Sequence, residues 1–229
     1  MTQHGYFVTG TDTEVGKTIV SLELMRLLQA QGHVVTGMKP VASGCQRNSS
    51  GLFNDDALRL QAQASFTVPY SRVNPYAFEP AVAPHIAAAA EGVEIRLDVI
   101  ETALTSIVQD ADRVVVEGVG GWMVPVNATR TMEDVALALG LPVILVVGIR
   151  LGCINHALLT EKAIKACGLK IAGWVANRLD PACQAQDETV AALHQHLSAA
   201  CLGDLPYHAD GEFAGQLSLP DQSVSPDSV

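Results

Sequence analysis

The sequence predicts an α/β fold in which helices cover both faces of a mostly parallel β-sheet. Short β-branched runs alternate with longer stretches of helical periodicity along the 229 residues. Two of these runs, "RVVVEG" at 113–118 and "PVILVVG" at 142–148, have continuous apolar centres, as strands buried on both faces of a sheet do. The first apolar strand leads into Gly-Lys-Thr at 16–18, the typical end of a phosphate-binding loop.

The expected strands and helices follow one another in regular order. Strands are expected at residues 6–10, 34–40, 113–118, 142–148 and 170–177. Helices are expected at residues 18–32, 55–65, 84–91, 97–110, 155–167 and 184–200. The Pro-rich passage at 68–84 is expected to hold little regular structure. No linker or repeat divides the chain, so residues 1–217 are expected to form a single domain, followed by a disordered Ser/Asp/Pro-rich tail at 218–229.

Composition limits the class of protein and its partners. Hydrophobic residues make up 48% and charged residues 17% of the chain, which is typical of a compact soluble protein. The net charge of -10 argues against nucleic acid or an anionic membrane as a partner, because both bind basic surfaces. The five cysteines form no C-x-x-C pair, which favours reduced thiols in a cytoplasmic protein. The longest apolar run, 141–149, is too short to cross a bilayer.

The segment "FVTGTDTEVGKT" at 7–18 predicts a nucleotide-phosphate site and hence a P-loop NTPase-type fold. A strand-to-helix turn places backbone N–H groups and the positive end of a helix dipole against an anion. Lys17 would reach the β- and γ-phosphates, and the Thr18 hydroxyl would ligate Mg²⁺. The loop is one residue longer than the strict pattern. Its Asp12 has no expected role beyond bracing the loop.

Two further polar clusters come next along the chain. One follows the second predicted strand, and the other lies at the start of the next helix. In "MKPVASG", Lys39 would point into a crevice at the end of the strand, although a lysine at such a position is as often solvated. Ser43 is either a substrate contact or an ordinary turn residue. In "NDDA", Asp55 and Asp56 are either capping groups of the helix or, for one of them, a metal ligand, and their spacing does not choose between them.

The segment "VVVEGVGGW" supplies another cluster. Glu117 directly follows a buried strand, where phosphate-loop enzymes place the carboxylate that holds Mg²⁺. The alternative is a Gly-rich turn with one solvated glutamate. Gly118, Gly120 and Gly121 would let a ligand approach the backbone. At the end of "WVAN", the Asn177 amide would either bind an adenine edge or cap the turn.

With these clusters in place, the chain resembles the dethiobiotin synthetases, the ATP-dependent carboxylase/cyclases of biotin synthesis. The resemblance spans residues 5 to 210 and rests on "VTGTDTEVGKT", "KPVASG", "VNPYAF", "APHIAA", "VEGVGGW", "PVILVVG", "LGCINH" and "AGWVAN". It implies a cytoplasmic homodimer that joins 7,8-diaminononanoate, CO₂ and ATP, with Mg²⁺. The products would be dethiobiotin, ADP and phosphate, formed through a carbamate and a carbamic–phosphoric anhydride.

The resemblance also implies the residues of the site. Catalytic roles would fall to Thr13, Lys17 and Lys39. The Mg²⁺ ligands would be Thr18, Asp56 and Glu117. The diamine would contact Thr13, Ser43 and, across the dimer interface, Gly152, Cys153, Ile154 and Asn155. The nucleotide would contact Glu14, Val15, Gly16, Lys17, Thr18, Ile19, Asp56, Glu117, Gly118, Val119, Gly120, Asn177, Arg178, Pro206, Tyr207 and His208.

An ATP-driven switch of the partitioning or septum-site type is the alternative hypothesis, because such proteins share this fold. Their phosphate loops carry a second lysine at the position where this chain has Asp12. The tail of this chain is acidic, whereas a membrane-anchoring helix of such a switch would be basic and amphipathic. Both differences favour the synthetase.

Overall fold

The computed structural model describes residues 5–207 and 216–220, and a six-stranded parallel sheet forms its centre. The strands lie in the order β10-β9-β8-β1-β7-β2, and each neighbouring pair is parallel. Their bounds are Gly5–Gly10 (β1), Val35–Met38 (β2), Arg113–Gly121 (β7), Val143–Ile149 (β8), Ile171–Arg178 (β9) and Cys201–Leu205 (β10). The predicted parallel α/β sheet is confirmed.

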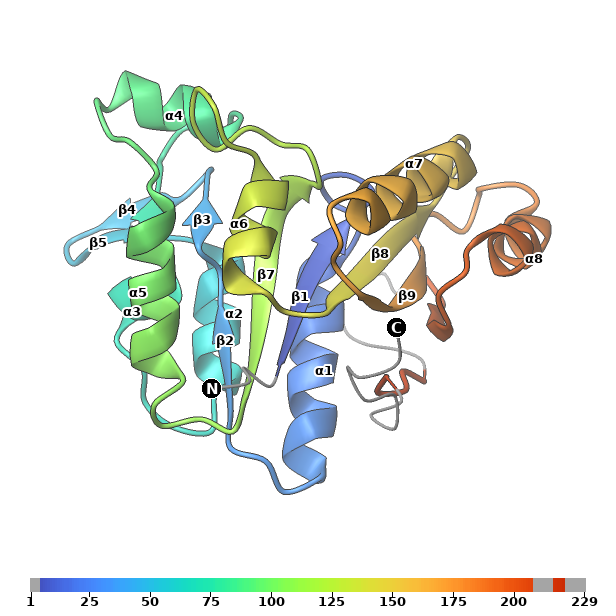
Figure 1. The fold of residues 1–229 in the computed structure, drawn as a ribbon, viewed down its shortest axis with the longest axis horizontal. Helices are drawn as coiled ribbons and strands as arrows, with labels where there is room; N and C mark the ends of the chain where they lie inside the picture. The colour runs from blue at the N-terminus through green and yellow to red at the C-terminus, as the bar shows by residue number, and fades with distance from the viewer. Residues whose placement is uncertain (1–4, 208–215, 221–229) are drawn as a thin grey trace.

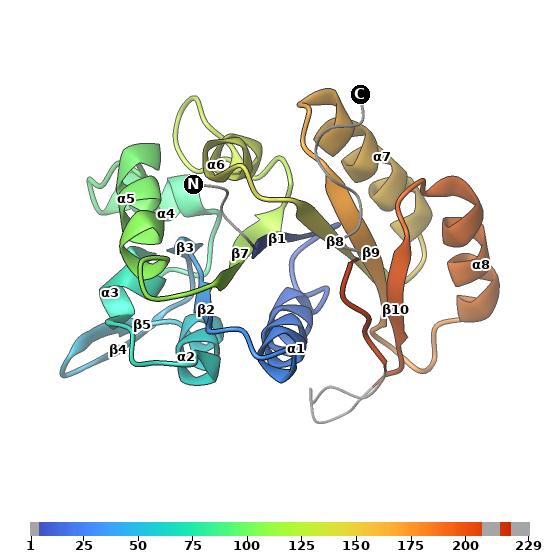
Figure 2. The same ribbon diagram turned by 60° about the horizontal axis from the view of Figure 1, so that its bottom comes forward.

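Helices cover both faces of this sheet (Figures 1 and 2). On one face lie α1 (Lys17–Ala30) and α2 (Asp55–Gln63). On the other lie α5 (Leu97–Ile107), α6 (Met132–Leu139), α7 (Cys153–Ala166) and α8 (Gln186–His196). The short helices α3 (Tyr70–Val73) and α4 (Pro84–Ala90) lie on the β2 side of the molecule. Within the described part of the chain, no helix is both long enough and apolar enough to traverse a lipid bilayer.

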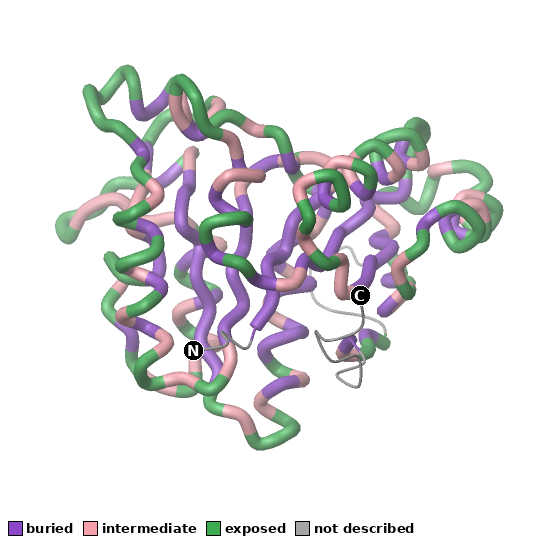
Figure 3. Tube along the Cα trace, in the orientation of Figure 1, coloured by how far each residue is buried: buried purple, intermediate pink, exposed green. Residues whose placement is uncertain are grey.

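Buried apolar clusters hold these layers together. Successive residues of a strand point to opposite faces, so Phe7 packs beneath α5 and α6 while Val8 packs against α1. A further cluster around Trp174 fills the space beneath α7 and α8. Figure 3 shows the central strands as buried along their length, with the exposed residues gathered on the outer helices and loops. The strands are therefore buried on both faces, as their continuous apolar runs predict.

Two small sheets are present among the described residues and follow β2 along the chain. β3 (Val41–Ala42) pairs in parallel with β6 (Tyr76–Ala77), and β4 (Gln46–Asn48) pairs antiparallel with β5 (Gly51–Phe53). Sequence patterns did not predict these strands because each is only two or three residues long. The β3–β6 pairing joins the segment after β2 to the Pro-rich passage.

Other elements differ from expectation for identifiable reasons. Helix α6 was not predicted, although Thr131 and Asp134 form a capping box at its start. Strand β10 was not predicted, because "CLGDL" contains no β-branched or aromatic residue. The prediction for β7 ended at residue 118, whereas the strand continues to Gly121.

Residues 216–220 return to the edge of the sheet. The Ser218 N–H donates to the Leu202 carbonyl at 2.8 Å. Leu217 is buried in the cluster beneath α1, and Leu219 packs against the same cluster. The expected domain boundary at residue 217 therefore lies within a segment that packs on β10. The rest of the expected tail, 221–229, lies outside the described residues.

Candidate active site

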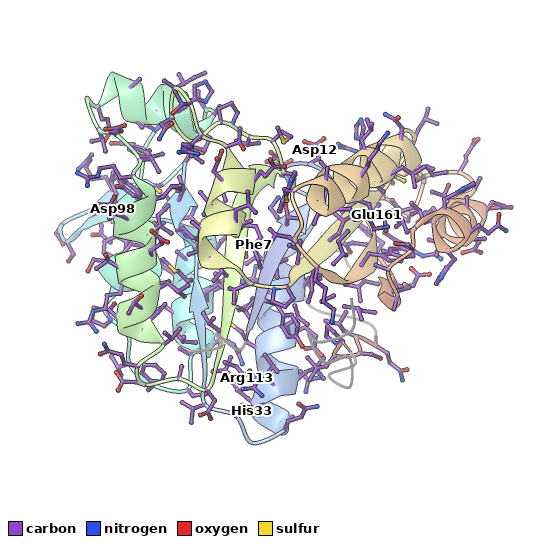
Figure 4. The ribbon with its side chains drawn as sticks, viewed as in Figure 1. Phe7, Asp12, His33, Asp98, Arg113 and Glu161 are labelled. Atoms are coloured by element: carbon purple, nitrogen blue, oxygen red, sulfur yellow. The ribbon has the colours of Figure 1, made fainter. Side chains whose placement is uncertain are left out.

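The predicted phosphate-binding loop lies at the carboxyl edge of the sheet, between β1 and α1. Figure 4 shows Asp12 at this edge, at the opposite end of the sheet from His33 and Arg113. The Thr11 N–H donates to the Val146 carbonyl of β8 at 2.9 Å, which fixes where the loop leaves the sheet. The N-terminus of α1 follows, so the loop ends at a site that favours an anion.

Two residues of the loop have a left-handed backbone, Glu14 (φ 59°) and Gly16 (φ 90°). At position 16 the surroundings also exclude a side chain, because a Cβ would lie 2.1 Å from Asn177 Nδ2. That amide nitrogen donates to the Val15 carbonyl at 2.9 Å. The end of β9 therefore holds the loop in a conformation that requires glycine at position 16.

The Lys17 side chain is buried and points back into its own loop, where Nζ donates to the Asp12 carbonyl at 2.8 Å. Burial and the nearby Lys39 ammonium lower the pKa of Lys17 to about 8, although the carboxylates of Glu117, Asp56 and Asp12 oppose this shift. A bound phosphate would give this ammonium an anionic acceptor in place of the Asp12 carbonyl.

A buried cluster of opposite charges lies beside the loop. Lys39 Nζ lies 2.5 Å from Glu117 Oε1 and 2.7 Å from Asp56 Oδ2. The Thr18 hydroxyl donates to Glu117 Oε1 at 2.9 Å. Burial lowers the pKa of Lys39, but the two carboxylates outweigh it and raise this pKa above its ordinary value. Burial raises the pKa of Asp56, but Lys39 and the Thr18 hydroxyl bring it below its ordinary value.

Different elements contribute the members of this cluster. Thr18 lies in the first turn of α1, Lys39 directly follows β2, and Asp56 lies in the first turn of α2. Glu117 lies within β7, directly after the apolar run of residues 114–116. There the register against β1 shifts between Val8 and Gly10, so β7 is irregular where Glu117 is presented.

Asp55 and Asp56, which spacing alone did not separate and of which the resemblance implies Asp56, lie beside residues with different contacts. The side chain of Asn54 caps α2, accepting from the Ala57 N–H at 3.2 Å. Asp56 accepts from Lys39 Nζ. The capping role therefore belongs to Asn54, and Asp56 belongs to the charged cluster.

The cluster has the properties of a divalent-cation site. Glu117 Oε2 is buried and meets no hydrogen-bond donor among the described residues. Thr18, Asp56 and Glu117 supply a hydroxyl and two carboxylates, the hard oxygen ligands that Mg²⁺ prefers. A cation held by these groups would share both carboxylates with Lys39. The residues present therefore fit Mg²⁺.

Two glycines of β7, Gly118 and Gly120, lie close to other residues of the protein, and the restriction is stronger at Gly120. A Cβ at Gly118 would lie 3.2 Å from the Phe7 ring. Gly120 has a φ of +61°, and a Cβ there would lie 2.7 Å from Val124 Cγ2 and 3.6 Å from Thr13 Oγ1. Thr13 thus lies beside β7, on the exposed side of the loop.

Asp12 makes contacts on both sides of its carboxylate. Oδ1 accepts from the Thr13 N–H at 2.8 Å, a contact within the loop. Oδ2 forms an ion pair with Arg150, a contact that the sequence analysis missed. The sequence does show that Asp12 and Arg150 carry opposite charges and each follow a strand. This predicts an ion pair only if β8 is known to lie beside β1. The pair joins the phosphate loop to residues 152–155.

Residues predicted to bind the diamine lie in two places. Ser43 follows β3 and is half-buried. Gly152 is the N-cap of α7, with φ 92°; Cys153 is buried, Ile154 is partly buried and Asn155 is exposed. The described contacts of a single chain do not join Ser43 to this helix start.

A cavity of about 470 Å³ lies between the phosphate loop, the end of β7 and α7. Its lining is mostly apolar and includes Trp122, Met123 and Leu159, with Asp12 at the loop side. Met123 and Leu159 are 58% and 59% exposed, so the apolar lining continues onto the surface. Such a surface is typical of a binding or subunit-contact region.

The residues predicted at the adenine end are only partly described. Arg178 pairs with Asp204 and Asp187, each at 2.7 Å, and so ties β9 to β10 and α8. Pro206 and Tyr207 follow β10 and are exposed. The predicted contact at His208 lies outside the described residues.

Known proteins resemble this chain in sequence over most of its length. A family model described as "AAA domain" matches residues 4–213. The ATP-dependent dethiobiotin synthetase BioD of Xanthomonas oryzae pv. oryzae (strain PXO99A) is 49% identical over 218 residues, covering 94% of this chain and 97% of the relative. The protein of that name from Pseudomonas paraeruginosa (strain DSM 24068 / PA7) is 49% identical over 206 residues, covering 90% of each.

Solved structures of low sequence similarity share the fold. The MinC:MinD cell division protein complex of Aquifex aeolicus matches with a TM-score of 0.54 and 14% identity, covering 91% of this chain and 86% of that one. The Cyanthece apo McdA structure matches with a TM-score of 0.55 and 12% identity, covering 91% and 88%. At these identities the likeness concerns architecture alone.

Proposed function

Because the chain belongs to the ATP-dependent dethiobiotin synthetase family, we propose that it forms the ring of dethiobiotin at the phosphate-loop site. It is a ligase that joins 7,8-diaminononanoate to CO₂ and consumes ATP. One observation carries the location of the site: Lys17 and Thr18 adjoin a buried cluster in which Lys39 lies within 2.7 Å of both Asp56 and Glu117.

The phosphate loop is assigned to ATP. Backbone N–H groups of residues 14–18 and the N-terminus of α1 would hold the β- and γ-phosphates. Lys17 would leave the Asp12 carbonyl and donate to phosphate, which would favour its charged form. Residues 118–120, Asn177 and the turn after β10 would lie along the rest of the nucleotide. The Asn177 bond to Val15 supports this role, because it links that region to the loop.

The first chemical steps create negative charge that the two lysines can neutralise. One unprotonated amine adds to the CO₂ carbon, and the ammonium formed loses a proton to give a carbamate anion. Lys17, Lys39 and the Thr13 hydroxyl would stabilise this anion. A carbamate oxygen then attacks the γ-phosphorus and ADP leaves, a step that depends mainly on positioning and charge neutralisation.

Ring closure follows from the same placement. The second amine attacks the carbonyl carbon of the carbamic–phosphoric anhydride, phosphate leaves, and the nitrogen loses a proton. Because the two amines lie on adjacent carbons, this step is intramolecular and has a small entropic cost.

We assign Mg²⁺ to Thr18, Asp56 and Glu117. Bound there, the ion would supply positive charge to the nucleotide phosphates. Glu117 Oε2 is buried and has no hydrogen-bond partner in the described part of the chain, which supports this assignment.

A homodimer would complete the diamine site. Residues 152–155 of one subunit would reach the carboxylate of a diamine held by Thr13 and Ser43 of the other. Exposed apolar side chains, Met123 and Leu159 at the cavity and Leu151 before α7, offer a surface for the second subunit. The net charge of -10 and the free cysteines support a cytoplasmic enzyme with no nucleic-acid or membrane partner.

The switch ATPase is not favoured. MinD and McdA share the fold at 14% and 12% identity, whereas dethiobiotin synthetases are 49% identical to this chain. The position that carries a second lysine in switch loops holds Asp12, which pairs with Arg150.

An assay of phosphate release with and without the diamine tests the function. Purified protein with Mg-ATP and bicarbonate should release phosphate only when 7,8-diaminononanoate is added, and dethiobiotin should form in equal amount. ATP turnover that does not depend on the diamine would contradict the synthetase and favour the switch.

A further inference from the structure

Asn74, in the motif "VNPYAF", is a buried residue to which the proposed reaction gives no role. It is 3% exposed. Its Nδ2 donates to the Lys39 carbonyl at 2.7 Å and to the Tyr76 carbonyl at 3.1 Å. Its Oδ1 accepts from the Tyr70 hydroxyl at 2.9 Å. Both donor hydrogens of the amide are thus used, and one of them holds the backbone of a proposed catalytic lysine.

The backbone of Lys39 is held on its other side as well. Strand β2 ends at Met38, and the Lys39 N–H donates to the Val73 carbonyl at 2.8 Å. Neighbouring residues 73 and 74 therefore bind both polar groups of the Lys39 backbone. Lys39 lies just beyond the central sheet, and its backbone is hydrogen-bonded by the Pro-rich passage instead.

Tyr70 continues the network to the other side of the ion pair. Its hydroxyl accepts from the Asn54 N–H at 2.8 Å while donating to Asn74. Asn54 caps α2, whose first turn carries Asp56. Asp56 in turn accepts from Lys39 Nζ at 2.7 Å. The contacts form a closed ring: Lys39 backbone, Asn74, Tyr70, Asn54, the first turn of α2, Asp56, and Lys39 side chain.

We propose that Tyr70 and Asn74 are positioning residues for ring formation, and that they hold Lys39 and Asp56 in register with each other. This inference rests on the proposed roles of Lys39 and Asp56. A charged pair acts on a transferring phosphoryl group through its exact position, so small displacements of its support reduce the rate.

The side-chain types in the ring suit this task. An aspartate at position 74 would set a carboxylate against the carbonyls of Lys39 and Tyr76, whereas asparagine donates to both. At position 70, the ring packs against Phe53 with centroids 4.7 Å apart. Burial raises the pKa of Tyr70, so its hydroxyl keeps its proton and remains a donor at neutral pH. Phenylalanine would keep the packing and remove both hydrogen bonds.

The test is a double-mutant cycle with Tyr70→Phe and Lys39→Gln, read by kcat and by the KM for ATP. Tyr70→Phe should lower kcat about tenfold and leave the KM for ATP within about twofold, since the phosphate loop is untouched. Lys39→Gln should lower kcat further. The double variant should be no slower than Lys39→Gln by more than about twofold, because Tyr70 acts through Lys39.

Ser65→Ala is the matched control. Its hydroxyl accepts from the Val35 N–H at 3.0 Å, at the opposite end of β2 from Lys39. Like Tyr70→Phe, Ser65→Ala removes a hydroxyl that accepts a hydrogen bond from a backbone N–H. It should lower the Tm without changing kcat. Asn74→Asp, if it folds, should reproduce the kinetic pattern of Tyr70→Phe.

The outcomes separate this inference from the proposed function. If Lys39→Gln is slow but Tyr70→Phe stays within twofold of wild type, the positioning role is wrong and the function stands. The positioning role would also be wrong if the fold-losses in kcat of the two single variants multiplied in the double variant, because Tyr70 would then act independently of Lys39. If Lys39→Gln itself is harmless, the proposed role of Lys39 and this inference both fail, while diamine-dependent phosphate release still decides the function.

Discussion

The Asn177 side-chain amide donates to the Val15 carbonyl at 2.9 Å, and this bond fastens the carboxyl end of β9 to the phosphate loop. The same nitrogen occupies the space that a side chain at position 16 would need. The loop is thus shaped by a residue that lies far away in the sequence. Phosphate binding should depend on that contact.

Gly16→Ala should raise the KM for ATP by about a hundredfold or more. The new Cβ would lie 2.1 Å from Asn177 Nδ2, and alanine would also have to adopt a left-handed backbone. Gly32→Ala is the control, because Gly32 has a φ of +88° but a Cβ there would meet nothing within 4 Å. Steady-state kinetics measures both. If both substitutions changed the KM for ATP equally, the contact between position 16 and Asn177 would be unimportant.

ATP affinity should fall as the pH rises above 8. In the free protein the pKa of Lys17 is lowered to about 8, and a bound polyphosphate favours the charged form. The nucleotide complex therefore binds more protons than the free protein above this pH, and binding takes up a proton. Calorimetry at pH 8.5 in buffers of different ionisation enthalpy measures the uptake. Lys17→Gln should abolish it, and an absence of uptake in the wild type would contradict the assignment.

Glu117→Gln should lower kcat about tenfold or more and raise the Mg²⁺ concentration needed for half-maximal rate, so that excess Mg²⁺ restores part of the activity. Glu161→Gln is the control. Glu161 lies on α7 (Figure 4) and is also buried, but it accepts from the Ser198 N–H and hydroxyl at 2.9 and 2.8 Å. Glu161→Gln should lower the free energy of unfolding and leave the Mg²⁺ concentration for half-maximal rate unchanged. An unchanged Mg²⁺ requirement in Glu117→Gln would remove Glu117 from the metal site.

The Asp12–Arg150 pair should matter for the substrate more than for stability. The two side chains are 44% and 47% exposed, so breaking the pair should cost at most about 1 kcal/mol of unfolding free energy. Arg150→Ala should raise the KM for the diamine about fivefold, because the pair orients the start of α7. The exchange Asp12→Arg with Arg150→Asp should recover part of this loss.

Arg47→Ala supplies the comparison for that experiment, since Arg47 forms an exposed pair with Glu79 away from the loop. Differential scanning calorimetry and diamine kinetics measure each variant. A diamine KM that is the same in Arg150→Ala and Arg47→Ala would show that the Asp12 contact does not reach the substrate.

The parts of the site that the sequence predicted are those fixed by strand ends. Lys39 directly follows β2, Thr18 lies in the first turn of the helix after β1, and Glu117 lies within β7, where the Lys39 ammonium and the Thr18 hydroxyl reach it. Spacing did not separate Asp55 from Asp56 and the resemblance pointed to Asp56, which in the structure contacts Lys39 while Asn54 caps the helix.

What the sequence did not predict depends on which segments become neighbours. Arg150 reaches Asp12 only because β8 pairs with β1, and no local pattern specifies strand order. Asn74 reaches Lys39 through the β3–β6 pairing, whose strands are two residues long. Strand β10 has weak β-propensity and is stabilised by its place beside β9.

The strand order also decides when this protein can first hold a nucleotide during its synthesis. β1 is made first but lies inside the sheet, where Gly5 pairs with Val114 and Gly10 with Val146. The loop after β1 needs Val146 and Asn177 to hold it. The chain leaves the ribosome from its N-terminus, so a nascent chain that stops before β9 contains Val146 but lacks the Asn177 contact with the loop. We therefore expect tight nucleotide binding only late in synthesis, once most of the domain has been made.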